Sequence, residues 1–237
     1  MNKPQKRIGI LFSGGKDSCM AAYLAKKEGY EISCLITLFS ENKESYMFHT
    51  PSIEKTKYQA QSMNLPLLVY KTKGEKEEEL IDLENAIKDA KKKYKLDAIA
   101  TGALYSVYQA SRIQKICDKL KLKCFNPLWH KEEIPYLKEL LENKFKIIII
   151  GVFAYPLDKT WLGREINDQF IEEVAKLKEK YQIHGAGEGG EFETFVLNCP
   201  LFKEELKISS FKDLKEGENS FRRELEIKPL SLNKKIK

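Results

Sequence analysis

The chain has 237 residues, of which 42% are hydrophobic, and 41 basic against 35 acidic side chains give it a formal net charge of +6. This size suits one large or two small globular domains, and the small charge excess gives no reason to expect nucleic acid as a partner. Five scattered cysteines without a C-x-x-C pair predict neither a disulfide framework nor a zinc site, and the longest apolar run, residues 147–155, is far shorter than the ~18 residues of a membrane span. We therefore expect a cytoplasmic protein without a membrane segment.

Strand-like and helix-like segments alternate over the first half of the chain. Short apolar runs predict the strands, and apolar residues at a spacing of 3.6 predict the helices. The predicted strands span residues 7–12, 31–39, 66–70, 97–100 and 123–125, and the predicted helices span residues 17–28, 51–63, 75–94 and 106–120. This alternation predicts an α/β fold with a doubly wound, Rossmann-like parallel sheet, in which ligands bind beyond the carboxyl ends of the strands.

The pattern changes after residue 125, where strands no longer alternate regularly with helices. The predicted helices of this part span residues 134–145 and 166–181, and the predicted strands span residues 146–154, 193–197, 206–209 and 221–227. We therefore expect a second, smaller α+β domain. The predicted division is an ATP-binding domain over residues 1–125 and a substrate-binding domain over residues 126–237.

A glycine-rich loop connects the first predicted strand to the first predicted helix. Its two adjacent glycines let main-chain N–H groups approach an anion, and the following helix adds its positive N-terminal end. A lysine and two serines add polar groups, and Asp17 is a candidate Mg²⁺ ligand, directly or through water. The spacing differs from that of a Walker A loop. We predict that this loop binds the phosphates of ATP through Ser13, Gly14, Gly15, Lys16, Asp17 and Ser18.

A second segment, residues 101–109, follows the fourth predicted strand and so lies at the same edge of the sheet. Gly102 would permit a close backbone approach, and we count it with Ser106 and Gln109 as candidate ATP-binding residues. Tyr108 is a candidate substrate-binding residue, and Arg112, one turn further, could reach a phosphate or a carboxylate. The alternative is a plain strand-to-helix junction with a surface arginine.

The third segment, residues 187–194, places three glutamates among three glycines. If the chain is extended from Gly190, Glu191 and Glu193 share one face, and Glu188 folds beside them through the flexible glycines. Clustered carboxylates could bind a cation, accept a proton, or hold an ammonium or trimethylammonium group. The alternative is a solvated acidic hairpin. The candidate catalytic residues are Glu188, Glu191 and Glu193, together with Asp17 and Arg112 of the two earlier segments. The candidate substrate-binding residues of this segment are Glu188, Gly189, Gly190 and Thr194.

The remaining polar candidates give weaker signals. His49, His130 and His184 show no metal-ligand spacing, so we expect surface or structural roles for them. Cys19, just inside the first predicted helix, is expected to be a small buried packing residue.

Taken together, these segments resemble the diphthine-ammonia ligase family, which belongs to the N-type ATP pyrophosphatases with a PP-loop. The glycine-rich loop alone indicates only the superfamily. The acidic segment near the end narrows the resemblance to this family. The resemblance covers nearly the whole chain. It rests on S-G-G-K-D-S at residues 13–18, G-A-L-Y-S-V-Y-Q-A-S-R-I at 102–113, N-P-L-W at 126–129, L-G-R at 162–164 and G-E-G-G-E-F-E-T-F-V-L-N-C-P-L-F at 187–202.

The resemblance implies ATP-dependent amidation of diphthine, a modified histidine on translation elongation factor 2, with ammonium as the nitrogen source. An acyl-adenylate would form, and the products would be diphthamide, AMP and pyrophosphate. ATP and Mg²⁺ are implied as cofactors. On this interpretation the three glutamates hold the cationic diphthine group or deprotonate ammonium. Arg112 or the substrate-binding candidate Arg164 offsets developing negative charge.

Two other functions stay open at this point. One is a PP-loop enzyme that thiolates or amidates tRNA, which predicts a catalytic cysteine pair or an RNA-binding appendage. The other is a non-catalytic ATP-binding module, which has no need of the acidic segment. The sequence does not determine whether the chain forms a homo-oligomer.

Overall fold

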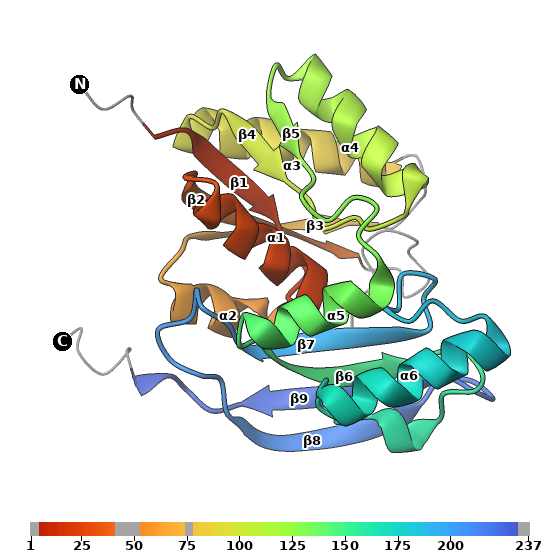
Figure 1. Ribbon diagram of the computed structural model, residues 1–237. Coiled ribbons are helices and arrows are strands. Elements are labelled where there is room, and N and C mark those ends of the chain that lie inside the picture. The colour runs from red at the N-terminus through yellow and green to blue at the C-terminus, as the bar shows by residue number, and fades with distance from the viewer. Residues whose placement is uncertain (1–4, 41–52, 74–77, 232–237) are drawn as a thin grey trace.

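The first half of the chain forms a sheet of five parallel strands in the order β3-β2-β1-β4-β5 (Figure 1). The structure is a computed structural model that describes residues 5–40, 53–73 and 78–231. The strands are β1 (Arg7–Leu11), β2 (Glu31–Ser40), β3 (Leu67–Thr72), β4 (Ala98–Ala100) and β5 (Lys123–Phe125). The helices are α1 (Lys16–Lys27), α2 (Thr56–Met63), α3 (Glu78–Tyr94) and α4 (Val107–Lys119), and the 3-10 turn η1 (Ile53–Lys55) precedes α2. The predicted doubly wound parallel sheet is confirmed.

The strand order places the topological switch point between β1 and β4. From β1 the chain winds outward through β2 and β3, and it then returns to pair β4 with the other side of β1. Ligands of doubly wound sheets bind where the winding direction reverses. The loops that follow β1 and β4, residues 12–15 and 101–106, are therefore neighbours at the edge where a ligand is expected.

The second half forms a four-stranded antiparallel sheet in the order β7-β6-β9-β8. Its elements are α5 (Glu133–Glu142), β6 (Lys146–Val152), the 3-10 turn η2 (Lys159–Trp161), α6 (Asp168–Tyr181), β7 (Phe192–Asn198), β8 (Ile208–Lys215) and β9 (Phe221–Ile227). The predicted second α+β part is confirmed. The strand predicted over residues 206–209 is wrong in extent, because β8 is a mostly exposed edge strand whose polar residues continue to pair with β9.

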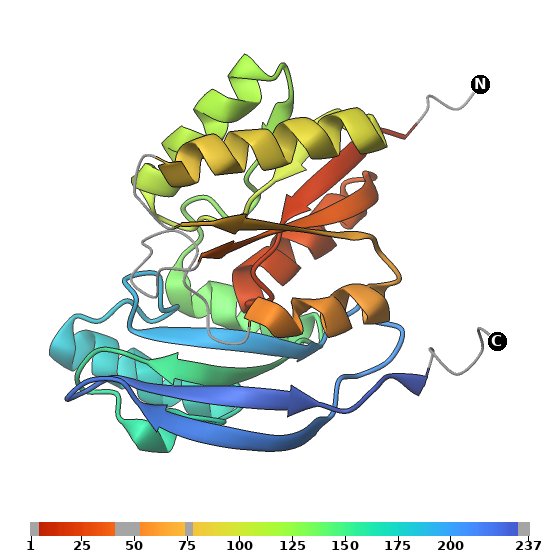
Figure 2. The same ribbon diagram turned by 180° about the vertical axis from the view of Figure 1, so that it is seen from behind.

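The edge strand β7 of the antiparallel sheet lies nearest to the parallel sheet, with α1, α2 and α5 at the junction, and α3 and α4 cover the far face of the parallel sheet (Figures 1 and 2). The largest hydrophobic cluster fills the central layer, and it includes residues of β1, α1, α5, β6, α6 and β7. A second cluster packs α3 and α4 on the parallel sheet, and a third lies on the face of the antiparallel sheet opposite α5 and α6. A shared core thus joins the two halves at the edge that carries the site.

The predicted division at residue 125 coincides with the end of β5, but it stays a prediction because the central core contains residues from both sides of it. In the described part of the chain, no helix combines the length and the apolar composition that crossing a bilayer requires.

Candidate active site

The glycine-rich loop turns sharply from β1 into α1. Gly14 has φ +82°, a conformation that glycine adopts without steric cost. Gly15 is the N-cap of α1 and has no side chain to satisfy the first N–H groups of the helix. Thr194 of β7 supplies part of this cap, because its Oγ1 accepts a hydrogen bond of 3.1 Å from the Lys16 N–H. The predicted substrate-binding Thr194 therefore contacts the start of α1, directly after the glycine-rich loop.

The loop is also braced by its own serines and by α2. Ser18 Oγ donates to the Gly15 carbonyl at 3.1 Å and accepts from the Ser13 N–H at 3.3 Å. Gln59 of α2 is fully buried, and its Nε2 donates to the carbonyl oxygens of Gly14 and Val196 at 2.9 and 2.8 Å. These bonds fix the loop at the N-terminus of α1, and backbone N–H groups at a helix N-terminus favour an anion.

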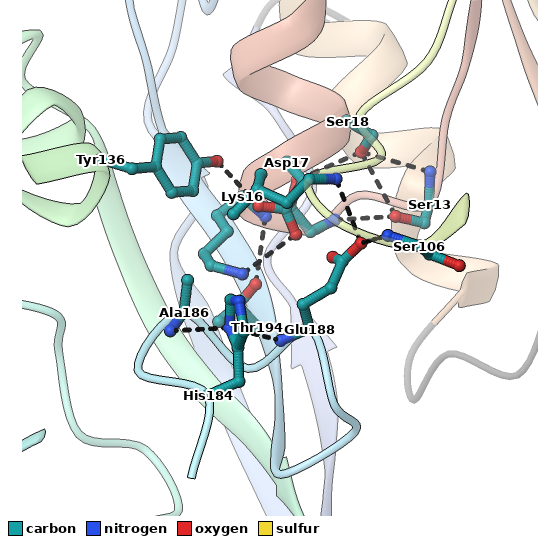
Figure 3. Close-up of polar contacts among 12 residues, drawn as sticks. Ser13, Lys16, Asp17, Ser18, Ser106, Tyr136, His184, Ala186, Glu188 and Thr194 are labelled. Atoms are coloured by element: carbon teal, nitrogen blue, oxygen red, sulfur yellow. Dashed lines mark hydrogen bonds and ion pairs between the residues drawn. The ribbon is translucent and has the colours of Figure 1, made fainter. Parts of the chain in front are cut away.

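Asp17 lies in the first turn of α1 and is held from two sides (Figure 3). Its Oδ2 is 3.0 Å from the Nζ of Lys16, a residue only 4% exposed. Its Oδ1 accepts a hydrogen bond of 2.8 Å from the hydroxyl of Tyr136 on α5. Burial, together with the neighbouring Asp17, raises the pKa of Tyr136 well above its usual range, so the hydroxyl is a donor at physiological pH.

The segment after β4 packs against the backbone of α1. A Cβ added at Gly102 would lie 2.7 Å from the carbonyl carbon of Asp17, so only glycine fits there. The close approach predicted for Gly102 is thus made to α1, the helix that follows the glycine-rich loop. Ser106 is the N-cap of α4, and its Oγ accepts from the Gln109 N–H at 3.3 Å. ATP contacts of Gly102, Ser106 and Gln109 stay predictions.

Glu188 links the acidic segment to the start of α4 (Figure 3). Its Oε1 accepts hydrogen bonds from the backbone N–H groups of Leu104, Tyr105 and Ser106, each at 3.1 Å. Three donors on one carboxylate oxygen form a charge-assisted clamp between the two halves of the chain. In this structure Glu188 therefore holds a loop at the switch point, and its carboxylate does not stand free as a base.

The rest of the acidic segment folds around two side chains. Glu191 is 8% exposed, and its Oε1 accepts from the His184 N–H at 2.7 Å. His184 Nδ1 accepts from the N–H groups of Ala186 and Glu188 at 3.3 and 3.2 Å, which supports the structural role expected for this histidine. Gly189 lies against the Glu191 carboxylate, and Gly190 has φ +84°. His49 lies outside the described residues.

Glu193 does not join the other two glutamates. Strand β7 begins only at Phe192, so Glu191 belongs to the preceding turn and the expected shared face is not formed. Along β7, Thr194 faces the ATP loop and Glu193 faces the opposite side, where Arg222 and Glu216 are its charged neighbours. Burial raises the pKa of Glu193 to about 8, while Arg222 lowers it.

The two predicted arginines are held by aromatic rings. The Arg112 guanidinium carbon lies 3.4 Å from the centroid of the Tyr108 ring, and its NH1 donates to the Tyr108 carbonyl. The Arg164 guanidinium stacks on Trp161 at 4.1 Å and pairs with Glu173 at 2.8 Å. Arg164 thus has an ionic and an aromatic partner on the antiparallel sheet side, and the structure does not bring it to Asp17. Its contact with substrate stays a prediction.

Residues that the sequence analysis did not select complete the site. Tyr136 and Glu133 lie one turn apart on α5. Glu133 accepts hydrogen bonds from the Gly185 N–H and from Lys178 Nζ. The Tyr136 hydroxyl donates to Asp17. Gln59 braces the loop from α2. These three residues lie on helix faces that pack inward. The sequence pattern there predicts a core-facing position and does not indicate a contact with the site. Cys19 is fully buried, as expected.

The site fits a magnesium ion that is held mainly by phosphates. The Asp17 side chain is 28% exposed, and each of its oxygens keeps a lone pair beyond the contacts to Tyr136 and Lys16. Within the described ranges, no group of three His, Cys, Asp or Glu residues forms a metal cage. Mg²⁺ commonly binds through one or two carboxylates together with substrate phosphates. Asp17 could supply the one protein carboxylate of this pattern.

The comparisons agree with this architecture. The diphthamide synthase N-terminal domain matches residues 6–124, and the diphthamide synthase C-terminal domain matches residues 132–228. The diphthine-ammonia ligase of Mus musculus is 31% identical over 236 residues, 91% of this chain and 87% of that protein. That of Homo sapiens is 33% identical over 223 residues, 86% of this chain and 83% of that protein.

Among solved structures, a U34-tRNA thiolase from Methanococcus maripaludis aligns with a TM-score of 0.38 at 16% identity, over 80% of this chain and 72% of that one. The two family matches together span both sheets, and the relatives match along nearly the whole chain. The chain belongs to the diphthamide synthase family.

Proposed function

We propose that this protein amidates the diphthine carboxylate of translation elongation factor 2 with ammonia, at the expense of ATP, and that it releases diphthamide, AMP and pyrophosphate. Family membership supports the reaction. The observation that carries the proposal is the direct contact between the acidic segment and both loops at the switch point, through Thr194 to Lys16 and Glu188 to residues 104–106. A module that only binds ATP has no need of such an arrangement.

The proposed chemistry has two balanced steps. An oxygen of the substrate carboxylate attacks the α-phosphorus of ATP, and pyrophosphate leaves. Ammonia then attacks the acyl carbon, the bond to AMP breaks, and one proton is lost. The first turn of α1, with Lys16, binds the outer phosphates and orients pyrophosphate as the leaving group. When bound, Mg²⁺ offsets the charge of the phosphates, with Asp17 as its protein ligand.

The remaining residues position the acceptor in this proposal. Glu188 and Glu191 shape the acidic segment beside the loops, and its carboxylates make the surroundings favourable for a cationic diphthine group. The roles of Arg112, Arg164 and Tyr108 toward the substrate are part of the proposal. Because the acceptor works in translation, we place the reaction in the cytoplasm.

The first prediction concerns the products of ATP. Because the helix terminus grips the outer phosphates, the α-phosphorus is left open to attack, so we expect AMP and pyrophosphate in amounts equal to the amide formed. The assay incubates the purified protein with ATP, ammonium and diphthine-bearing elongation factor. The nucleotides would then be separated by chromatography, and the mass of the factor would be measured by mass spectrometry. ADP as the sole nucleotide product would refute the proposed reaction.

The second prediction concerns the nitrogen donor. A glutaminase of the cysteine type needs a reactive thiolate. Burial raises the pKa of Cys34 and of Cys199 to about 12, and raises that of Cys19 well above its usual range. A hydrogen bond from Cys117 lowers the pKa of Cys124, but Cys124 packs on the face of the parallel sheet that α3 and α4 cover, and not at the candidate site. We therefore expect nitrogen-15 from ammonium, and not from the glutamine amide, to appear in the modified factor. Equal labelling from both donors with the purified protein would contradict this expectation.

A further inference from the structure

Tyr136 is a buried tyrosine whose hydroxyl points at the ATP loop. It is 1% exposed, and α5 places its ring in the central core. Its hydroxyl donates to Asp17 Oδ1 at 2.8 Å, which joins two residues that lie 119 positions apart (Figure 3). A phenylalanine would fill the same volume of core. Core packing therefore does not require the Tyr136 hydroxyl, whereas its hydrogen bond to Asp17 does.

The contact fixes the orientation of the Asp17 carboxylate. Lys16 Nζ holds Oδ2 at 3.0 Å, and Lys16 is itself confined, with Nζ 5.7 Å from the centroid of the Phe192 ring. With one oxygen held by Tyr136 and the other by Lys16, rotation about the Cβ–Cγ bond would break both bonds. The lone pairs that remain are then directed by these two contacts.

We propose that Tyr136 is a positioning residue that orients the Asp17 carboxylate toward the metal-bound triphosphate. This inference rests on the proposed function for the role of Asp17. Groups that hydrogen-bond a metal ligand typically change metal affinity by ~10- to 100-fold when they are removed. Tyr136 reaches the loop from the second half of the chain, so the correct docking of that half sets the geometry of the ATP site.

A second tyrosine between the same two helices serves as a control, because it tests whether the Tyr136 contact only holds the helices together. Tyr23 of α1 donates through its hydroxyl to Asn143 Oδ1 at 2.8 Å, at the C-terminal end of α5. Both tyrosines thus join α1 to α5 through one hydroxyl, but only Tyr136 touches Asp17. Tyr136→Phe and Tyr23→Phe each remove one oxygen and keep the ring in place.

The experiment measures Mn²⁺ binding in the presence of ATP by electron paramagnetic resonance, without acceptor, and thermal unfolding of the same samples. We expect Tyr136→Phe to weaken Mn²⁺ binding by about 10-fold, and Tyr23→Phe to leave it unchanged. In the Asp17→Asn background, Tyr136→Phe should add no further weakening, because the residue acts through that carboxylate. Mg²⁺ titrations of pyrophosphate release should shift in parallel.

Unchanged Mn²⁺ affinity in Tyr136→Phe would overturn the proposal, and so would an equal loss in Tyr23→Phe, because the contact would then be a general tether. An additive effect of Tyr136→Phe in the Asp17→Asn background would also overturn it. These outcomes are separate from the proposed function, because the binding assay contains no elongation factor. Failure to amidate diphthine, with the Mn²⁺ results as expected, would refute only the reaction.

Discussion

Replacing Asp17 by asparagine should lower pyrophosphate release by at least about 10²-fold, because it removes the negative charge of the proposed protein ligand of Mg²⁺. Asparagine keeps an oxygen that accepts from the Tyr136 hydroxyl, so the buried hydroxyl retains a partner and the fold should persist. Pyrophosphate release would be followed in single turnovers at saturating ATP. Circular dichroism would confirm the folded state.

Asp168→Asn is the matched control for this variant. Asp168 also lies in the first turn of a helix, α6, and it is exposed. It therefore shares with Asp17 the favourable interaction with the helix N-terminus, worth about 0.3–1 kcal/mol, and shares none of the contacts to the loop. Wild-type turnover by Asp17→Asn, or an equal loss in Asp168→Asn, would remove Asp17 from the proposed chemistry.

The change from Glu188 to glutamine should lower amidation by about 10²-fold and change ATP affinity little. Glutamine keeps the shape of the side chain but removes the charge that strengthens three hydrogen bonds to residues 104–106. The acidic segment would then sit less firmly beside the loops, and small displacements in an active site cost about 10²-fold in rate. Amide formation and equilibrium ATP binding would be measured on the same preparation.

Glu172→Gln, on the exposed face of α6, controls for the loss of one negative charge in the same half of the chain. It should amidate at the wild-type rate. If Glu188→Gln instead loses ATP binding, and amidates normally once ATP saturates, the clamp serves the nucleotide and our assignment of this segment to the acceptor is wrong. Intact amidation at all ATP concentrations would show that the clamp has no part in the reaction.

The position of the site in the fold could be predicted from the sequence. The order of strands and helices determines a doubly wound sheet, and that sheet places Ser13–Ser18 and Gly102–Ser106 together where β1 and β4 end. The need for glycine at position 14 also follows from the local turn. These features depend on short stretches of chain, so local periodicity and turn chemistry are enough to determine them.

The register of the acidic segment was decided by the tertiary structure. Because side chains alternate along a strand, the residue at which β7 begins determines which glutamates share a face. The turn before Phe192 separates Glu191 from Glu193, and only Thr194 on the inner face reaches Lys16. Sequence spacing cannot locate that turn, since the glycines before it permit several conformations.

The partners of the ATP loop from distant parts of the chain were likewise decided only by packing. Tyr136 and Gln59 lie on helices whose inward faces read as core, and Glu188 could have been a free carboxylate as far as its neighbours in sequence indicate. Each contact spans at least 45 positions, and hydrogen bonds over such separations depend on how helices and sheets dock. The sequence alone determined the glycine-rich loop, which we propose binds the phosphates. Docking of the second half determined which side chains hold that loop in place, because local patterns specify elements whereas long-range burial specifies their neighbours.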